Sequence, residues 1–95
     1  MYEVVDNYVE ARQPYRQQHL QLAADATARG ELLLGGAYAE PVDGALLVFR
    51  GASREVAESF VRDDPYVHNG LVKRWTIRSW TVVAGSLLLD VNPIA

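Results

Sequence analysis

The spacing of apolar residues divides the first part of the chain into a strand and a helix. Tyr2 to Val9 is short and rich in Tyr and Val, which is typical of a strand. A helix is predicted from Gln13 to Arg29, because Pro14 suits a first helical turn and Gly30 suits the position after a helix end. On a helical repeat, one face of this segment holds Arg16, His19, Leu20, Ala23 and Thr27.

Two apolar runs follow, and they are expected to pair as a hairpin. Glu31 to Tyr38 is too short and too rich in glycine for a helix, and predicts a buried strand with a bulge or close contact at Gly35-Gly36. Asp43-Gly44 predicts the turn, which Pro41 makes longer than two residues. Ala45-Leu46-Leu47-Val48-Phe49 is the second strand. Because both runs are continuously apolar, they should carry hydrophobic side chains to both faces of their sheet.

A second helix and a last strand complete the pattern. Ser53 is predicted to cap a helix whose apolar stripe consists of Val56, Ala57, Phe60 and Val61. This helix must end before Pro65, so Asp63-Asp64-Pro65-Tyr66 should form a turn that holds two carboxylates at a corner. Leu71 to Thr81 alternates, with Trp75 and Ile77 on one side, and predicts a fourth strand.

The element order over residues 1–81 is βαββαβ. It predicts an α+β, ferredoxin-like fold with an antiparallel sheet and both helices on one face. The other, apolar face of the sheet needs a cover, which predicts a homodimer. Residues 82–95 are apolar but interrupted by Gly85 and Asp90, and are expected to form a dimer arm or an edge strand.

Composition narrows the partners and the function classes. Nine basic and twelve acidic residues give a net charge of −3, which argues against nucleic acid as a partner. The absence of cysteine excludes disulfides, thiolate zinc sites and Cys nucleophiles. The start Met1-Tyr2-Glu3 is acidic, unlike a leader, and no apolar run approaches the ~20 residues that span a bilayer. A soluble, cytoplasmic protein without a membrane partner is therefore expected.

Few side chains are candidates for chemistry. His19 and His68 are the only histidines, and histidine is the side chain that ordinarily changes charge near neutral pH. Asp64 would orient an imidazole, and Arg16, one turn before His19, would hold an anionic oxygen. The alternative interpretation is structural: His19 packs its ring, Asp64 builds a turn before Pro65, and Tyr66 is more readily a packing aromatic than an acid. No metal-binding or nucleophile-elbow motif occurs, so neither a metal site nor a serine hydrolase is predicted.

Several short motifs occur together in this chain: Arg16-x-x-His19, Leu34-Gly35-Gly36, Asp43-Gly44 before Ala45-Leu46-Leu47-Val48-Phe49, Asp64-Pro65-Tyr66-Val67, and Gly70-Leu71-Val72. In this combination they resemble the YCII-related family over about residues 1–81. The resemblance implies a dimeric α+β barrel, in which two ferredoxin-like sheets pack face to face. It also implies that His19 and Asp64 form the active-site pair, with Arg16 beside them. Arg78-Ser79-Trp80 departs from the family, which often has a proline there, and residues 82–95 have no counterpart.

Two functions follow from these observations. Some relatives are similar to muconolactone isomerases or act in the breakdown of chlorinated hydroxyquinols, chemistry that moves protons on small cyclic or aromatic compounds. The leading hypothesis is a small, cofactor-free lyase or isomerase with His19 as general base or acid, Asp64 orienting it, and Arg16 and Tyr66 binding the substrate. The alternative is a non-catalytic dimeric module that binds a small metabolite or a partner protein.

Overall fold

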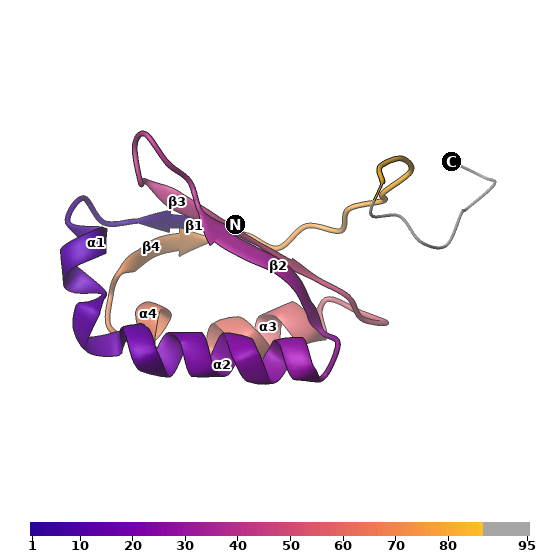
Figure 1. Cartoon of the computed structure of the whole chain (residues 1–95), viewed down its shortest axis with the longest axis horizontal. Helices are drawn as coiled ribbons and strands as arrows, with labels where there is room; N and C mark the ends of the chain where they lie inside the picture. Colours follow the sequence, from indigo (N-terminus) through magenta and orange to yellow (C-terminus); the bar gives the residue numbers. More distant parts are fainter. Residues whose placement is uncertain (87–95) are drawn as a thin grey trace.

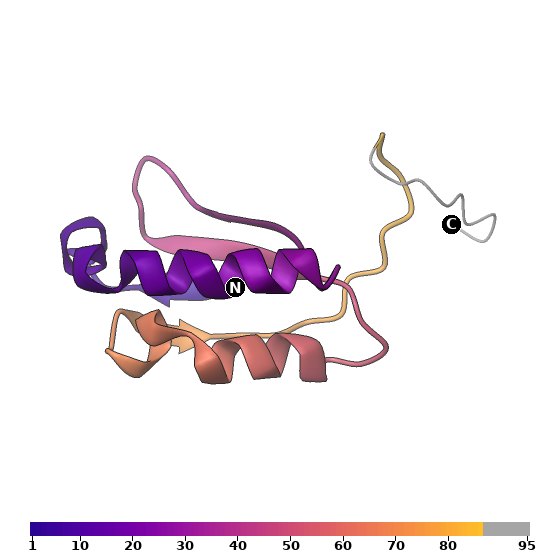
Figure 2. The same cartoon turned by 60° about the horizontal axis from the view of Figure 1, so that its bottom comes forward.

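The chain forms a four-stranded antiparallel sheet with helices on one of its faces (Figure 1). This computed structural model describes residues 1–86. The strand order is β2-β3-β1-β4, and Figure 2 shows α2 and α3 side by side across the sheet. The elements are β1 (Tyr2–Val4), α1 (Tyr8–Ala11), the 3₁₀ helix η1 (Gln13–Tyr15), α2 (Arg16–Ala28), β2 (Leu32–Ala37), β3 (Gly44–Phe49), α3 (Glu55–Asp63), α4 (Pro65–His68) and β4 (Val72–Trp75). The α+β, ferredoxin-like fold predicted from the sequence is therefore confirmed.

The first strand is shorter than predicted. β1 ends at Val4, and a turn closed by the hydrogen bond from the Tyr8 amide to the Val5 carbonyl (3.1 Å) leads directly into α1. The prediction of a strand as far as Val9 was wrong because it read Tyr8 as a strand residue. The Tyr8 side chain is instead buried from a helix, where it joins the core with Tyr2.

The hairpin forms as predicted, except for the position of its irregularity. The register shifts between Leu32 and Leu34, so the bulge lies before the glycines rather than at Gly35-Gly36. The loop is longer than two residues, as Pro41 indicated. Gly44, at the start of β3, is required by a close approach: a Cβ there would lie 2.5 Å from the Tyr2 carbonyl oxygen.

Helix α2 covers the sheet with a face that includes His19. The chain enters the helix through η1 rather than directly at Pro14. Leu20, which the helical repeat groups with His19, is 48% exposed, whereas Ala26 is buried and Leu22 packs beside it. The inner face is centred on His19, Leu22 and Ala26, because residues three and four apart share one side of a helix. Leu20 lies about one residue's rotation away from that centre.

The second helical region bends at an aspartate. The Ser53 hydroxyl accepts a hydrogen bond from the Glu55 amide (3.3 Å), although Arg54 occupies the N-cap position of α3. The predicted stripe is confirmed, with Phe60 and Val61 buried. As predicted, α3 ends before Pro65. The four-residue helix α4 that follows was not predicted; the Asp64 carboxylate caps it by accepting from the Tyr66 amide.

The last strand is also shorter than the predicted Leu71 to Thr81. β4 pairs only with β1, in antiparallel fashion. The backbone hydrogen bonds between Met1 and Thr76 are the last between the two segments, so β4 stops beside the start of β1. Of the arm predicted over residues 82–95, residues 82–86 form no strand, and residues 87–95 lie outside the described part of the chain. Nowhere in residues 1–86 is a helix both long and apolar enough to cross a membrane.

The sheet face opposite the helices carries exposed apolar side chains. Alternation along β3 turns Ala45 and Leu47 toward the helix side, where they join the core, and therefore turns Leu46 to the open face. Leu46 is 40% exposed, and Leu34 on the neighbouring strand is 59% exposed. The prediction that these strands carry apolar side chains to both faces is confirmed.

Candidate functional site

The candidate site is built on the carboxylate of Asp64, which is fully buried between α3 and α4. Oδ1 accepts a hydrogen bond from the Tyr66 amide at 3.0 Å, the capping contact of α4. Oδ2 accepts a hydrogen bond from the Tyr2 hydroxyl of β1 at 2.7 Å. A buried carboxylate is stable only when several donors replace water, and here the donors come from different elements. The corner predicted at Asp63-Asp64 thus points one of its two carboxylates into the core.

His19 on α2 supplies a third contact to this carboxylate. Its Nδ1 lies 2.8 Å from Asp64 Oδ1. A carboxylate only accepts hydrogen bonds, so Nδ1 carries the hydrogen in this pair and Nε2 is the nitrogen left for other partners. The His19 side chain is 13% exposed, whereas that of Asp64 is fully buried. The arrangement therefore has a buried orienting group and an imidazole that retains some access to solvent.

Tyr2 and Asp64 are coupled electrostatically as well as by their hydrogen bond. Burial raises the pKa of the Tyr2 phenol well above its usual range, and the charge of Asp64 raises it further. Tyr2 therefore stays protonated and remains a hydrogen-bond donor over the range in which an exposed tyrosine begins to ionise. The Tyr2 hydroxyl thus engages Oδ2 of the same carboxylate whose Oδ1 contacts His19.

Tyr66 packs face to face against the imidazole of His19. The two rings are stacked, with centroids 3.8 Å apart and planes 7° from parallel. Phe60 meets the His19 ring edge-on at 6.2 Å, and Tyr8 meets Tyr66 in the same manner at 5.7 Å. Tyr66 itself has no exposed surface. The prediction that Tyr66 packs as an aromatic is confirmed, and its ring packs directly against the imidazole of His19.

Arg16 approaches the same ring from the start of α2. Its Nη1 donates to the Tyr66 hydroxyl at 3.4 Å, a long and therefore weak contact. The four residues predicted for the site, His19, Asp64, Arg16 and Tyr66, are thus brought together by α2 and the α3–α4 corner.

Sequence reasoning missed three neighbours of this group. Tyr2 contacts Asp64, Tyr8 packs on Tyr66, and the guanidinium carbon of Arg12 lies 5.1 Å from the centre of the Tyr8 ring. Burial raises the pKa of the Tyr8 phenol, while Arg12 opposes this rise. The only sequence signal for Tyr2 and Tyr8 was their type, since a buried tyrosine usually seeks a polar partner for its hydroxyl.

His68 does not belong to the site. It is exposed, and its Nε2 contacts the Arg62 carbonyl oxygen at the end of α3. Among the described residues, no group of three or more His, Asp and Glu side chains is placed to hold a metal ion.

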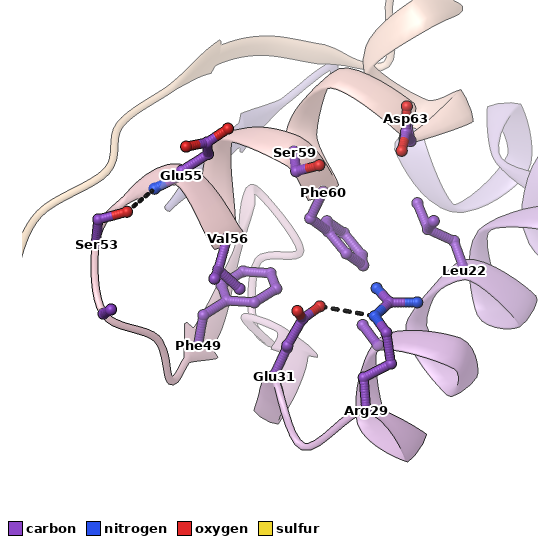
Figure 3. Close-up of a pocket in the computed structure, with 12 residues that line it drawn as sticks. Leu22, Arg29, Glu31, Phe49, Ser53, Glu55, Val56, Ser59, Phe60 and Asp63 are labelled. Carbon is purple, nitrogen blue, oxygen red and sulfur yellow. Dashed lines mark hydrogen bonds and ion pairs between the residues drawn. The ribbon is translucent and has the colours of Figure 1, made fainter.

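A hollow of about 530 Å³ lies beside the site, between α2 and α3 (Figure 3). Leu22, Phe49 and Phe60 form its apolar wall, and the ion pair between Arg29 and Glu31 lies at its edge. None of the four predicted site residues lines it. Because the Phe60 ring contacts both this hollow and His19, it forms the partition between them.

Comparison with known protein families identifies one match. The family profile described as the YCII-related domain matches residues 1–81. A search of curated proteins finds no match. The matched segment contains His19, Asp64, Arg16 and Tyr66, together with every helix and strand described above.

Proposed function

The chain belongs to the YCII-related family, and from this premise we propose that it is a small enzyme of the lyase or isomerase type, which moves protons on a small metabolite without a bound cofactor. The observation that carries the proposal is the contact of 2.8 Å between His19 Nδ1 and the fully buried Asp64 carboxylate. Such a contact selects the tautomer in which Nε2 is a base, and it stabilises the imidazolium that forms when Nε2 takes a proton.

The reaction step assigns each residue one task. Nε2 of His19 takes a proton from a carbon next to a carbonyl group, and the electron pair of the broken C–H bond moves to the carbonyl oxygen. Arg16 holds the enolate oxygen that results, since a guanidinium is a strong donor to an anionic oxygen. In a substrate whose enolate is conjugated with a C=C bond, the electron pair returns from the oxygen through the dienolate and the far carbon of that bond takes the proton from Nε2. The double bond thereby shifts to the carbon that was first deprotonated. Asp64 keeps its charge throughout and only orients the ring.

The placement of Arg16 supports this division of tasks. Arg16 contacts the hydroxyl of Tyr66, and His19 stacks on the ring of the same residue. A substrate oxygen that displaces the weak contact of 3.4 Å would therefore lie beside the imidazole. Because Tyr66 is fully buried, it contributes to substrate binding by positioning Arg16 through its hydroxyl rather than by touching the substrate.

We also propose that two copies pair through the open sheet face. Leu34 and Leu46 expose 59% and 40% of their surface there. A patch of this kind on a domain of 95 residues is destabilising in water unless it is covered, and a second identical sheet has the matching shape and chemistry.

A non-catalytic binding module is the second candidate, because the fold itself hosts many functions. The observation in its favour is that Tyr66 and Asp64 bury their functional groups almost completely, as a purely structural network does. Such a module would use the same arginine and imidazole to bind a ligand without changing it.

Deuterium exchange separates the two functions. The protein is incubated in heavy water with a panel of small 2-oxo acids and unsaturated lactones, and incorporation is followed by NMR. An enzyme exchanges protons of at least one compound, and His19→Gln lowers the rate about 100-fold or more, without loss of fold. His68→Gln is the matched control and leaves the rate unchanged. A compound that binds to the parent protein without exchange supports the binding module instead.

A further inference from the structure

Two arginines beside the site lack a carboxylate partner within residues 1–86. Arg12 is the residue that ends α1, and Arg16 begins α2. The Arg–carboxylate ion pairs of the described residues involve three other arginines, namely Arg29, Arg54 and Arg74. Arg50, Arg62 and Arg78 form no such pair within this part of the chain either. Arg12 and Arg16 differ from these three because they contact the aromatic rings that pack around His19.

Arg12 is the more unusual of the two. It is half-buried over the face of the Tyr8 ring, with its guanidinium carbon 5.1 Å from the ring centre. Its Nε is buried and has no hydrogen-bond partner among the described residues. A buried donor without an acceptor is destabilising, and native structures contain few of them. An anion that reaches this nitrogen would supply the missing acceptor.

A continuous set of ring contacts connects Arg12 to the imidazole. Arg12 lies on Tyr8, Tyr8 packs edge-on against Tyr66, and Tyr66 carries both the stacked His19 and the contact to Arg16. Asp64, the buried anion of this region, is engaged by His19, Tyr2 and Tyr66 rather than by an arginine. The positive charge of the two guanidinium groups therefore remains available to a ligand.

The spacing of the two arginines indicates what kind of ligand they fit. Both residues have right-handed helical backbone angles, and η1 connects them. Arg12 lies over the ring of Tyr8 and Arg16 contacts the hydroxyl of Tyr66, and the centroids of these two rings are 5.7 Å apart. Two guanidinium forks at this spacing suit two carboxylate groups joined by a short carbon chain better than they suit one small anion.

We infer that Arg12 and Arg16 together bind a dicarboxylate substrate. One carboxylate lies on Arg16 beside His19, where the five donors of the guanidinium also reach the adjoining enolate oxygen, and the other lies on Arg12 above Tyr8. This inference rests on the proposed function, because it assigns a substrate class to the same site. Arg12 is in this account a binding residue that determines specificity and takes no part in proton transfer.

The test measures the binding of simple anions by NMR at constant ionic strength. Succinate is the dicarboxylate probe, butyrate the monocarboxylate probe, and inorganic phosphate the compact dianion. We expect succinate to saturate and to shift the Nε–H signals of Arg12 and Arg16, with butyrate and phosphate at least about tenfold weaker. Equal binding of succinate and butyrate overturns the inference, as does tighter binding of phosphate.

Variants assign the binding to the two arginines. Arg12→Gln and Arg16→Gln should each weaken succinate binding by about tenfold or more, whereas Arg29→Gln, which alters an arginine already paired with Glu31, should leave it unchanged. If Arg12→Gln does not fold, Arg12→Lys keeps the charge but loses the planar fork, and should still weaken succinate more than butyrate. Undiminished succinate binding in a folded Arg12 variant overturns the inference.

A failure of the dicarboxylate site can be distinguished from a failure of the proposed enzyme activity. His19→Gln removes the proposed base but leaves both arginines, so it should still bind succinate within about threefold of the parent. Arginine-dependent succinate binding without any His19-dependent proton exchange supports the dicarboxylate site and contradicts the enzyme. His19-dependent exchange of a monoacid, without succinate binding, supports the enzyme and contradicts the dicarboxylate site.

Discussion

The imidazole of His19 lies flat against the phenol ring of Tyr66, with ring centroids 3.8 Å apart and planes 7° from parallel. The same imidazole is fixed at Nδ1 by Asp64, two residues before Tyr66 in the chain. One corner between α3 and α4 therefore sets both the plane of the ring and its rotation within that plane. The direction of Nε2 follows from these two contacts, so a change at the corner should alter the imidazole even though it lies on another helix.

The stacked geometry predicts a specific NMR signature. Protons of the His19 ring lie over the face of Tyr66 and should resonate upfield of those of the exposed His68. Tyr66→Phe keeps the aromatic face and should preserve the upfield shift. Tyr66→Leu removes the face, and the His19 signals should move toward those of His68. Identical His19 signals in the Phe and Leu variants would show that the rings are not stacked in solution.

Replacing the buried carboxylate should disturb both stability and the imidazole. Asp64→Asn removes the charge and turns one acceptor oxygen into a donor amide, so at least one of the three donors loses its acceptor, and the free energy of unfolding should fall by about 3 kcal/mol. The long-range ¹⁵N spectrum of His19 should show the Nδ1-protonated tautomer in the parent and a changed tautomer population in the variant.

Asp63 provides the matched control for this substitution. It precedes Asp64, is exposed, and forms no ion pair among the described residues. Asp63→Asn should change stability by less than about 0.5 kcal/mol and leave the His19 spectrum unchanged. Similar effects of both substitutions would indicate a general charge effect rather than the buried contact.

Much of this arrangement was predictable from local signals. Gly30 and Pro65 indicated where α2 and α3 end, because glycine readily adopts the positive φ found after a helix and proline disfavours helical geometry in the residue before it. The pairing of His19 with Asp64 was expected from family resemblance, because the number of residues between them does not tell how far apart they lie in space. Only the packing of α2 against the α3–α4 corner brings them to 2.8 Å.

The missed features have a common physical cause. Val9 was assigned to a strand from residue type alone, and Leu20 was grouped with His19 from the helical period alone, which does not specify how a helix is rotated against the sheet. Tyr2 was missed because its partner, Asp64, lies on another element. Arg12 was missed because its partner, Tyr8, was predicted to lie in a strand. Tertiary packing, rather than propensity, determines these positions.

The Tyr2 hydroxyl should make stability sensitive to alkaline pH. Burial and the charge of Asp64 raise the pKa of Tyr2 in the folded state. The protonated Tyr2 hydroxyl therefore contributes fully to the free energy of unfolding below the ordinary tyrosine pKa of about 10. This contribution is lost as the pH rises above that value, because only the unfolded chain then releases the proton. For one such proton, the free energy of unfolding falls by about 1.4 kcal/mol per pH unit.

Tyr2→Phe isolates this effect. At neutral pH the substitution should cost about 2 kcal/mol, because it removes a hydrogen bond of 2.7 Å to a charged acceptor. Above a pH of about 10 the difference between parent and variant should shrink, since the variant has no proton to lose at this position. Urea unfolding at several pH values measures both quantities. The other tyrosines, including Tyr8, are common to both proteins and cancel in the comparison. A difference that stays constant with pH would contradict the linkage between Tyr2 and Asp64.

The open sheet face makes a prediction about assembly. Leu46 is 40% exposed on this face, so Leu46→Lys would place a charge in the centre of the proposed sheet-to-sheet contact. The parent should elute with about twice the chain mass of 10.6 kDa in light scattering, and the variant with the mass of one chain. Leu20→Lys is the control, because Leu20 is 48% exposed but lies on α2, on the opposite side of the molecule. If the face is covered by a second copy, only the Leu46 change releases monomers. If both variants keep the parent mass, the apolar face is not the interface.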